Sequence, residues 1–572
     1  MIKHRFNIWQ RPAGLGIGIV SAQLLLACSG EMPTGGGTEP ERTDSSEQSL
    51  TGSILIHGQV RSPTGAPISG VKVTLSGAAS ASVTTGSSGA YSFPSLAPGA
   101  YTVTPSKSGL HFCTPSAALP KLRTDAVEDF AGSTSGCQTP VHTRNATVLI
   151  YDPPITRADG TKVTLSTYQN WEDPIQLVDR FKRSLQSMSN GRVKYSVVKT
   201  KTINAFPIKA DGFQYTQASY LACLADSTQC HAADTADVPL MLSSQGVCTD
   251  VNAGTTDELW LFGGPYFGTY ESQLTGPKAF QYNSPPLAGS TCNKLLPIMG
   301  FNYERSLAEM VHDTMHRTEA TMARVYGSWA EDRMANNFDR FGLIAAQSPS
   351  FNYSGCGNAH FSPNSTSDYD YSNPNPVSSF CDDFFNYPTL HTPSTVLKTI
   401  TCSAWGCDEL AYYRYFYQHL PKASGTGTDG KFNDWWRYVV KPNDIFLTDP
   451  LITCSSEYAP GWCNSVLDSV HGQCNVGEWA TASTPTGWAK IAFPTARPTS
   501  SVTLFDRACD EQVLAGHLEF SDGSANIAFG ALENTGVTGT TLSFANKTLT
   551  WVKVVIDQSS GANPGLGEVV IQ

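Results

Sequence analysis

Charged side chains are scarce in this sequence: Asp, Glu, Lys and Arg make up 15% of its 572 residues, against about 25% in an average soluble chain. The 38 basic residues, outnumbered by 49 acidic ones, form no stripe, which argues against nucleic acid as a partner. The sequence also has no C-x-x-C pair, no G-x-S-x-G turn and no phosphate-binding glycine loop. These absences exclude a C-x-x-C redox site, a nucleophile-elbow serine hydrolase and a Walker-type nucleotide site. Disorder of the whole chain is also excluded, because 40% of the residues are hydrophobic.

Long apolar runs are absent as well, and the one notable run lies near the N-terminus. The run Leu15–Leu26 follows Lys3, Arg5 and Arg11, and it is shorter than the ~20 residues that a membrane-spanning helix needs. A basic start followed by a short apolar run is typical of a secretory leader. The sequence therefore predicts a signal peptide over residues 1–27.

The apolar run ends in Leu25-Leu26-Ala27-Cys28, which resembles the lipobox of bacterial lipoproteins. The resemblance implies that Cys28 becomes the lipidated first residue of the mature chain. Ser29 stands where an Asp usually retains such proteins in the inner membrane, so the resemblance implies an outer-membrane protein held by its lipid anchor alone. The alternative is an ordinary cleaved signal peptide with a chance cysteine. Residues 28–52, rich in Gly, Ser, Thr, Glu and Pro, are predicted to form a flexible tether.

Short alternating strands separated by turn residues follow over residues 53–138 and predict a small all-β sandwich. Three segments carry a more specific pattern: Gly58–Val73, Ser87–Phe93 and Leu96–Val103. They resemble the carboxypeptidase-regulatory-like (transthyretin-like) domain family. The resemblance implies a spacer or adhesion module with no chemistry of its own.

Residues 141–447 form the largest block, in which strands and helices are mixed. Apolar runs predict buried strands at Val148–Tyr151 and Glu258–Phe262, and apolar spacing predicts helices over Ile175–Leu185 and from about Tyr303 to Gly327. This pattern favours an α/β or α+β domain, which includes the zincin-like type. Four segments resemble an uncharacterised family of secreted bacterial proteins, without an established activity: Asp257–Ser272, Ile298–Arg305, His316–Met322 and Cys381–Asp383.

Residues 448–572 are again predicted to be all-β, with strands separated by turns such as Ser521–Ser524. Segments near Trp479, Trp488–Ile491, Val502–Arg507 and Gly565–Val569 resemble the galactose-binding-like (discoidin, coagulation-factor-type C) jelly-roll family. Members of that family bind glycans, lipids or proteins. The resemblance implies binding of an extracellular polysaccharide or glycoprotein, and calcium in this domain is a further expectation.

The strongest candidate site lies on the long helix. His312 and His316 are four residues apart, so both imidazoles point from one face, and Glu309 and Glu319 extend that face. Two histidines one turn apart are what a zinc site requires from a single helix. The sequence predicts a zinc site with His360, from a downstream loop, as the third ligand and Glu319 as the alternative to it.

The helix departs from the zincin pattern H-E-x-x-H because Asp313 occupies the position of the general-base Glu. Asp is one methylene shorter, so it reaches a metal-bound water less well, and a base must come within hydrogen-bond distance of its proton. Asp313 or Glu309 is the expected water-activating group if the domain is a zinc-dependent hydrolase. In the alternative, the helix face is solvated and its charged residues form ion pairs.

A second hypothesis for this domain is glycoside hydrolysis by paired carboxylates beside aromatic side chains. The aromatic candidates are Trp260, Tyr266, Phe267 and Tyr270, and the acidic candidates are Glu271, Asp368, Asp370, Asp382 and Asp383. The alternative is a buried aromatic core with a solvated acidic loop. The acidic stretch Ser367–Tyr371 is a further calcium-binding candidate, although it lacks the EF-hand spacing and its Gly.

The cysteine count is odd, at 15, but it becomes even in each predicted domain once Cys28 is assigned to the lipid anchor. Two cysteines then fall in residues 53–138, eight in 141–447 and four in 448–572, which predicts disulfides in an oxidising, exported setting. The sequence thus predicts a lipid-anchored surface protein that binds a glycan and carries a metal-dependent hydrolase in its central domain. The competing hypothesis is a non-catalytic adhesion or scaffold protein whose central domain is only stapled by disulfides.

Overall fold

The computed structural model describes residues 53–62, 66–112, 114–123, 125–134, 141–232, 235–427, 429–459, 462–467, 471–473, 475, 478–508 and 511–572. The predicted signal peptide, Cys28 and the tether lie outside these residues, so they stay predictions. Internal contacts divide the chain into two units: the described parts of residues 1–321, 330–386 and 390–420, and those of 322–329, 387–389 and 421–572. Among the described residues, no helix combines the length and apolar character needed to cross a membrane.

The first unit begins with two small sheets that share one apolar core. Their strand orders are β4-β1-β9-β6, with β8 beside β1, and β3-β2-β5-β7. Side chains of β1 alternate between buried and half-buried, as expected for a strand with one face on a core. The strands are β1 (Ile54–Arg61), β2 (Lys72–Gly77), β3 (Ala81–Thr84), β4 (Ala90–Leu96), β5 (Gly99–Ser106), β6 (His111–Phe112), β7 (Ala117–Leu122), β8 (Ala126–Val127) and β9 (Phe130–Ser133).

The five-stranded central sheet has the order β13-β10-β14-β16-β15. Its strands are β10 (His142–Tyr151), β13 (Val193–Ile203), β14 (Glu258–Gly263), β15 (Ser272–Thr275) and β16 (Leu296–Asn302). All pairs are parallel except that of the edge strand β15 with β16. Every residue of β14 is buried, as in a strand that is covered on both faces.

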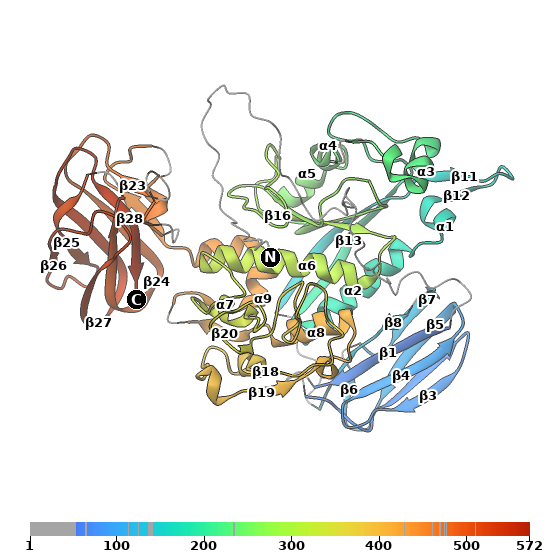
Figure 1. The fold of residues 1–572 in the computed structure, drawn as a ribbon. Coiled ribbons are helices and arrows are strands. Elements are labelled where there is room, and N and C mark those ends of the chain that lie inside the picture. Colours follow the sequence, from blue (N-terminus) through green and yellow to red (C-terminus); the bar gives the residue numbers. More distant parts are fainter. Residues whose placement is uncertain are drawn as a thin grey trace. The chain divides into compact units, whose positions relative to one another are not determined.

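Two helices position the centre of this unit. Helix α2 (Pro174–Met188) begins at the N-cap Asp173 and buries Leu177, Val178, Phe181 and Leu185. Ile175, which the apolar spacing of the sequence included in this stripe, is instead 52% exposed, because it lies more than a quarter-turn from the centre of the stripe. Helix α6 (Leu307–Tyr326) follows β16 and, in the first unit, lies between the central sheet and α8 (Glu409–His419) (Figure 1).

Shorter elements complete the first unit and the start of the second. The strands are β11 (Pro154–Thr156), β12 (Lys162–Thr164), β17 (Tyr353–Ser354), β18 (Val377–Ser379), β19 (Lys398–Ile400), β20 (Lys422–Thr426) and β21 (Phe432–Asp434). The helices are α1 (Leu165–Gln169), α3 (Gln217–Ala225), α4 (Val238–Ser244), α5 (Val247–Asn252), α7 (Asn337–Gly342) and α9 (Trp435–Val440). The 3-10 helices are η1 (Ser227–Gln229), η2 (Cys381–Asn386), η3 (Pro393–Thr395), η4 (Cys402–Ala404), η5 (Pro442–Leu447) and η6 (Trp462–Leu467).

The disulfides agree with the even partition of cysteines in the central block. All eight cysteines there pair with one another, as Cys223–Cys230, Cys248–Cys292, Cys356–Cys381 and Cys402–Cys407. Cys454 and Cys463 form a fifth bridge in the second unit. The remaining cysteines, namely Cys28, Cys113, Cys137, Cys474 and Cys509, lie outside the described residues.

The second unit is dominated by one sheet of order β23-β28-β24-β27-β25-β26, with β22 beside β24. The strands β24 and β27 are 20 residues long, and two register shifts divide their pairing into three segments. The strands are β22 (Leu451–Cys454), β23 (Trp479–Ala480), β24 (Gly487–Asp506), β25 (Val513–Phe520), β26 (Ile527–Phe529), β27 (Thr540–Ser559) and β28 (Gly565–Ile571). The predicted multidomain class, a β sandwich, a mixed α/β block and a C-terminal β jelly-roll, is confirmed.

Candidate metal centre

The candidate site is built on the first part of α6, which is not a solvated helix face. His312 is 4% exposed, and Asp313, Arg317 and Glu319 are also buried. Arg317 forms an ion pair with Glu258 of β14, where Nη1 and Oε1 are 2.8 Å apart. The face that carries the candidate ligands is therefore enclosed by the fold.

Three histidines converge on one point. His312 and His316 are one turn apart on α6, and His360 comes from the loop between β17 and β18. One ring nitrogen from each lies within 4.8 Å of the other two. The Nε2 atoms of His316 and His360 are 3.2 Å apart, close to the ~3.3 Å between two nitrogens bound tetrahedrally to one zinc ion at about 2.0–2.1 Å.

Partners on the other ring nitrogens orient two of these imidazoles. The Nδ1 atom of His316 is 3.0 Å from Oε2 of Glu319, and Nδ1 of His312 is 2.8 Å from the Tyr413 hydroxyl of α8. Such partners fix the tautomer and direct Nε2 outward, which is the usual arrangement around metal-binding histidines. The arrangement therefore presents Nε2 of His316 to an ion.

Glu319, the predicted alternative ligand, instead supports the cluster. Its Oε2 contacts His316, and its Oε1 accepts a hydrogen bond of 2.7 Å from the backbone N–H of Ala359. Burial lowers the pKa of His316, but the hydrogen bond and charge of Glu319, together with Glu271 and Glu309, outweigh it and leave that pKa raised. Glu319 thus links the helix to the loop that carries His360.

Three carboxylates form a second group beside the histidines. One oxygen from each of Glu271, Glu309 and Asp313 lies within 4.8 Å of the other two. Burial, followed by the charges of Glu271 and Glu309, raises the pKa of Asp313 well above its usual range. Burial likewise raises the pKa of Glu271, which the nearby His316 opposes.

The sheet explains why Glu271 lies there. Because β15 runs antiparallel to β16, Ser272 pairs with Met299 in the middle of β16, and Glu271 lies toward the C-terminal end of that strand. The backbone N–H of Gly300 donates a 3.0 Å hydrogen bond to the carbonyl of Glu271. A Cβ at Gly300 would lie 2.3 Å from the Tyr270 carbonyl, so this close approach of the strands requires glycine. Glu271 is therefore held beside the start of α6, which follows β16.

The other acidic candidates serve local structure. Asp382 contacts His419 and Lys398, and Asp383 contacts Arg340 and His391. Asp370 accepts hydrogen bonds from Asn373 and Thr366 at the base of its loop, and Asp368 lies 3.6 Å from His360 Nδ1. Of the five carboxylates considered for glycoside hydrolysis, Glu271 alone belongs to a carboxylate group in the described residues.

Two of the aromatic candidates, Trp260 and Phe267, belong to the core. Trp260 is fully buried, and its Nε1 donates a 2.8 Å hydrogen bond to Glu258. Phe267 packs against Phe206 in the core. Tyr369, which the sequence did not single out, lies at the histidine cluster, with its hydroxyl 3.3 Å from His360 Nε2 and a left-handed backbone at φ 60°. Such strained residues concentrate at functional sites.

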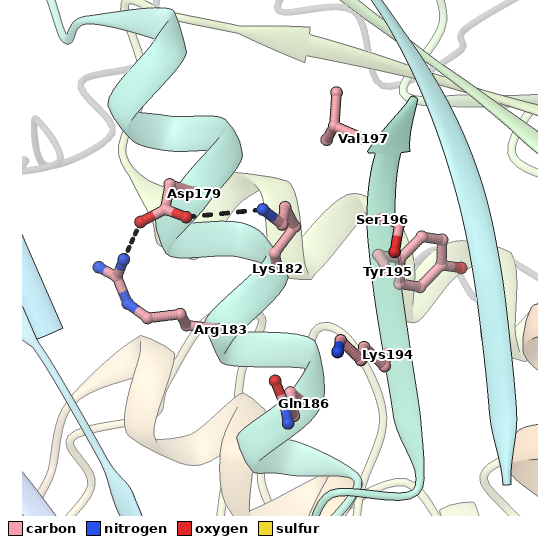
Figure 2. Close-up of a pocket in the computed structure, with 8 residues that line it drawn as sticks. All are labelled: Asp179, Lys182, Arg183, Gln186, Lys194, Tyr195, Ser196 and Val197. Carbon is pink, nitrogen blue, oxygen red and sulfur yellow. Dashed lines mark hydrogen bonds and ion pairs between the residues drawn. The ribbon is translucent and has the colours of Figure 1, made fainter. Parts of the chain in front are cut away.

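A separate hollow lies on the first unit between α2 and β13 (Figure 2). It measures about 410 Å³ and is lined by Asp179, Lys182, Arg183, Gln186, Lys194, Tyr195, Ser196 and Val197. Asp179 forms ion pairs with Lys182 and Arg183 along the helix. None of the candidate metal ligands lines this hollow, so it is distinct from the histidine cluster.

Comparison with known proteins identifies relatives for the two ends of the chain. A family model described as the carboxypeptidase regulatory-like domain matches residues 55–126, which confirms the resemblance predicted there. A second model, described as a domain of unknown function (DUF7402), matches residues 452–572. No curated protein matches the chain.

Similar solved structures include carbohydrate-binding modules. Chitosan-binding module 1 of a chitosanase/glucanase from Paenibacillus sp. IK-5 is 14% identical, with 22% of this chain and 96% of the module covered and a TM-score of 0.18. The CpGH89CBM32-5 module of Clostridium perfringens, solved with GalNAc-β-1,3-galactose, is 18% identical, with 21% and 94% covered and a TM-score of 0.18. At these values the similarity assigns no ligand to this chain.

Proposed function

We propose that His312, His316 and His360 bind one zinc ion and that the central domain is a metal-dependent hydrolase. The convergence of three ring nitrogens within 4.8 Å is the observation that carries this proposal. Two neutral imidazole nitrogens 3.2 Å apart would direct their lone pairs at each other, so either a proton or a cation belongs between them. A zinc ion matches both the ligand type and the separation.

The carboxylate group supplies the second requirement of hydrolysis. A bound zinc ion acidifies water and polarises a substrate oxygen, and a nearby carboxylate is needed to accept the proton. Glu309 and Asp313 extend from the same helix as His312 and His316, and Glu271 lies with them. We assign the proton acceptor to this group, because its three carboxylates lie together on and beside the helix that carries His312 and His316.

Removal of the third ligand gives a direct test of the zinc site. Addition of zinc to metal-stripped protein is expected to stabilise the wild type by about 2.7 kcal/mol at a hundredfold excess over the dissociation constant, since only the folded state presents the three nitrogens. The His360→Ala variant is expected to show little of this gain. Scanning calorimetry with and without zinc measures the difference.

The control is His391→Ala, which removes a histidine with a 54% exposed side chain that contacts Asp383 outside the cluster. Its zinc-dependent stabilisation should equal that of the wild type. Equal stabilisation of the His360→Ala variant would contradict the assignment of this ligand.

We propose glycan binding as a second function, located in the second unit. Trp488 and Trp551 are half-buried on β24 and β27, on the face opposite the apolar core. The Lys553 ammonium lies 5.1 Å from the ring centre of Trp488, and that of Lys490 lies 4.3 Å from the ring centre of Trp551. Aromatic rings that combine an apolar face with a polar edge suit sugar rings, and the lysines suit acidic groups on them.

Trp551→Ala is expected to reduce binding of the full chain to its best glycan on a glycan array by at least about tenfold, the loss expected from about 1.4 kcal/mol of contact energy. The removed ring is the contact surface, whereas the buried residues of β27 remain. Leu514→Ala, at an exposed position of the neighbouring strand β25, is the control and should bind like the wild type. Unchanged binding by Trp551→Ala, or no bound glycan for the wild type, would refute this function.

A further inference from the structure

Asp313 is unusual within the carboxylate group because it is buried and one of its oxygens lacks a partner. Asp313 is 1% exposed, and its Oδ1 has no hydrogen-bond partner. Glu271 receives one side-chain hydrogen bond, from Asn283. A buried carboxylate without a partner costs free energy, so buried charges in proteins are paired, protonated or bound to an ion.

The spacing of the carboxylates fits a bound cation. One oxygen from each of Glu271, Glu309 and Asp313 lies within 4.8 Å of the other two, and two oxygens bound to one calcium ion at about 2.3–2.6 Å lie no more than about 5 Å apart.

The charge balance also favours a cation. The group brings three carboxylates together, and one of them, Asp313, is buried. A histidine that binds the proposed zinc ion is a neutral imidazole. His312 and His316 would therefore not supply positive charge to balance the carboxylates. One divalent ion would compensate the excess negative charge and supply the missing partner of Asp313.

We propose that Glu271, Glu309 and Asp313 bind a second, oxygen-preferring divalent cation beside the zinc site. The three ligands are all carboxylate oxygens, which suit calcium or magnesium, whereas the imidazoles of the first site suit zinc. This inference rests on the proposed zinc site for its catalytic meaning, because a second ion beside the zinc ion would add to the charge that stabilises the reacting oxygens. The calcium expected from the sequence in the C-terminal domain would be a different site.

The test counts two metals in one sample. The full chain is loaded with zinc and equilibrated with radioactive calcium, and bound calcium and zinc are measured per chain. We expect Asp313→Asn to bind one calcium ion fewer than the wild type and to retain its zinc. Glu271→Gln should behave the same way, and it serves as a second variant should Asp313→Asn fail to fold.

The matched control is Glu304→Gln, which changes an exposed carboxylate just before α6 and should bind as much calcium as the wild type. Equal calcium in the wild type, Asp313→Asn and Glu271→Gln would overturn the second site, whatever the zinc content. If the wild type holds no zinc and Asp313→Asn still binds one calcium ion fewer than the wild type, the zinc site alone is refuted. The two failures are therefore distinguishable.

Discussion

Arg317→Met is expected to lower the stability of the central domain by about 3–5 kcal/mol, because it leaves a buried carboxylate without its counter-ion. Arg317 is 1% exposed, and its guanidinium is 2.8 Å from Oε1 of Glu258. Glu258 also accepts hydrogen bonds from the Tyr195 hydroxyl and from Trp260 Nε1. Burial lowers the pKa of Arg317, but Glu258 outweighs it and keeps the guanidinium charged.

Scanning calorimetry suits this multidomain chain because it separates transitions. The transition that contains α6 should fall by about 2–4 °C for each kcal/mol lost. Arg324→Met removes a partly exposed ion pair with Asp449 from the same helix and should cost about 1 kcal/mol or less. The double variant Arg317→Met/Glu258→Gln should recover part of the loss, since the unpaired charge is then gone. A loss below about 1 kcal/mol in Arg317→Met would show that the pair does not stabilise the fold.

The helix that carries the site could be predicted from local spacing. Residues four apart share a helix face, so the pairing of His312 with His316 follows from the sequence alone. The position of His360, by contrast, depends on the loop that carries it. The hydrogen bond from Ala359 to Glu319 holds this loop against the helix, and it joins segments 40 residues apart. Sequence distance suggested His360, but only the fold shows that Glu319 supports the cluster.

The carboxylate group shows where sequence reasoning fails. Glu271 was a candidate for another reaction, and its place beside Glu309 depends on the antiparallel pairing of β15 with β16. Alternation and apolar runs predict that strands exist, but strand order and direction arise from long-range pairing that the local pattern does not encode. The partner of Arg317 was missed for the same reason, because Glu258 lies on a separate strand and looked like the polar end of an apolar run.

His316→Ala is expected to remove essentially all bound zinc, the largest effect among the site variants. His316 occupies the centre of the cluster: its ring centre is 4.5 Å from that of His312 and 5.0 Å from that of His360. Its removal leaves two ligands, and a stable zinc site requires at least three protein ligands. It also frees Glu319 from its imidazole partner, so the support of the remaining ligands is weakened.

His231→Ala provides the matched control, since His231 contacts Asp211 far along the sequence from the cluster and its loss should leave zinc binding unchanged. Circular dichroism of each variant shows whether the fold is kept. A folded His316→Ala that lacks zinc supports a site built by this residue, and a folded variant that retains zinc places the ion elsewhere.

The zinc content of the purified full chain, measured by atomic emission after dialysis against metal-free buffer, tests the central claim most directly. The three-histidine site predicts about one zinc ion per chain in the wild type and in His231→Ala, and close to none in His316→Ala. A wild-type chain that contains no zinc and binds none when it is supplied would contradict the claim.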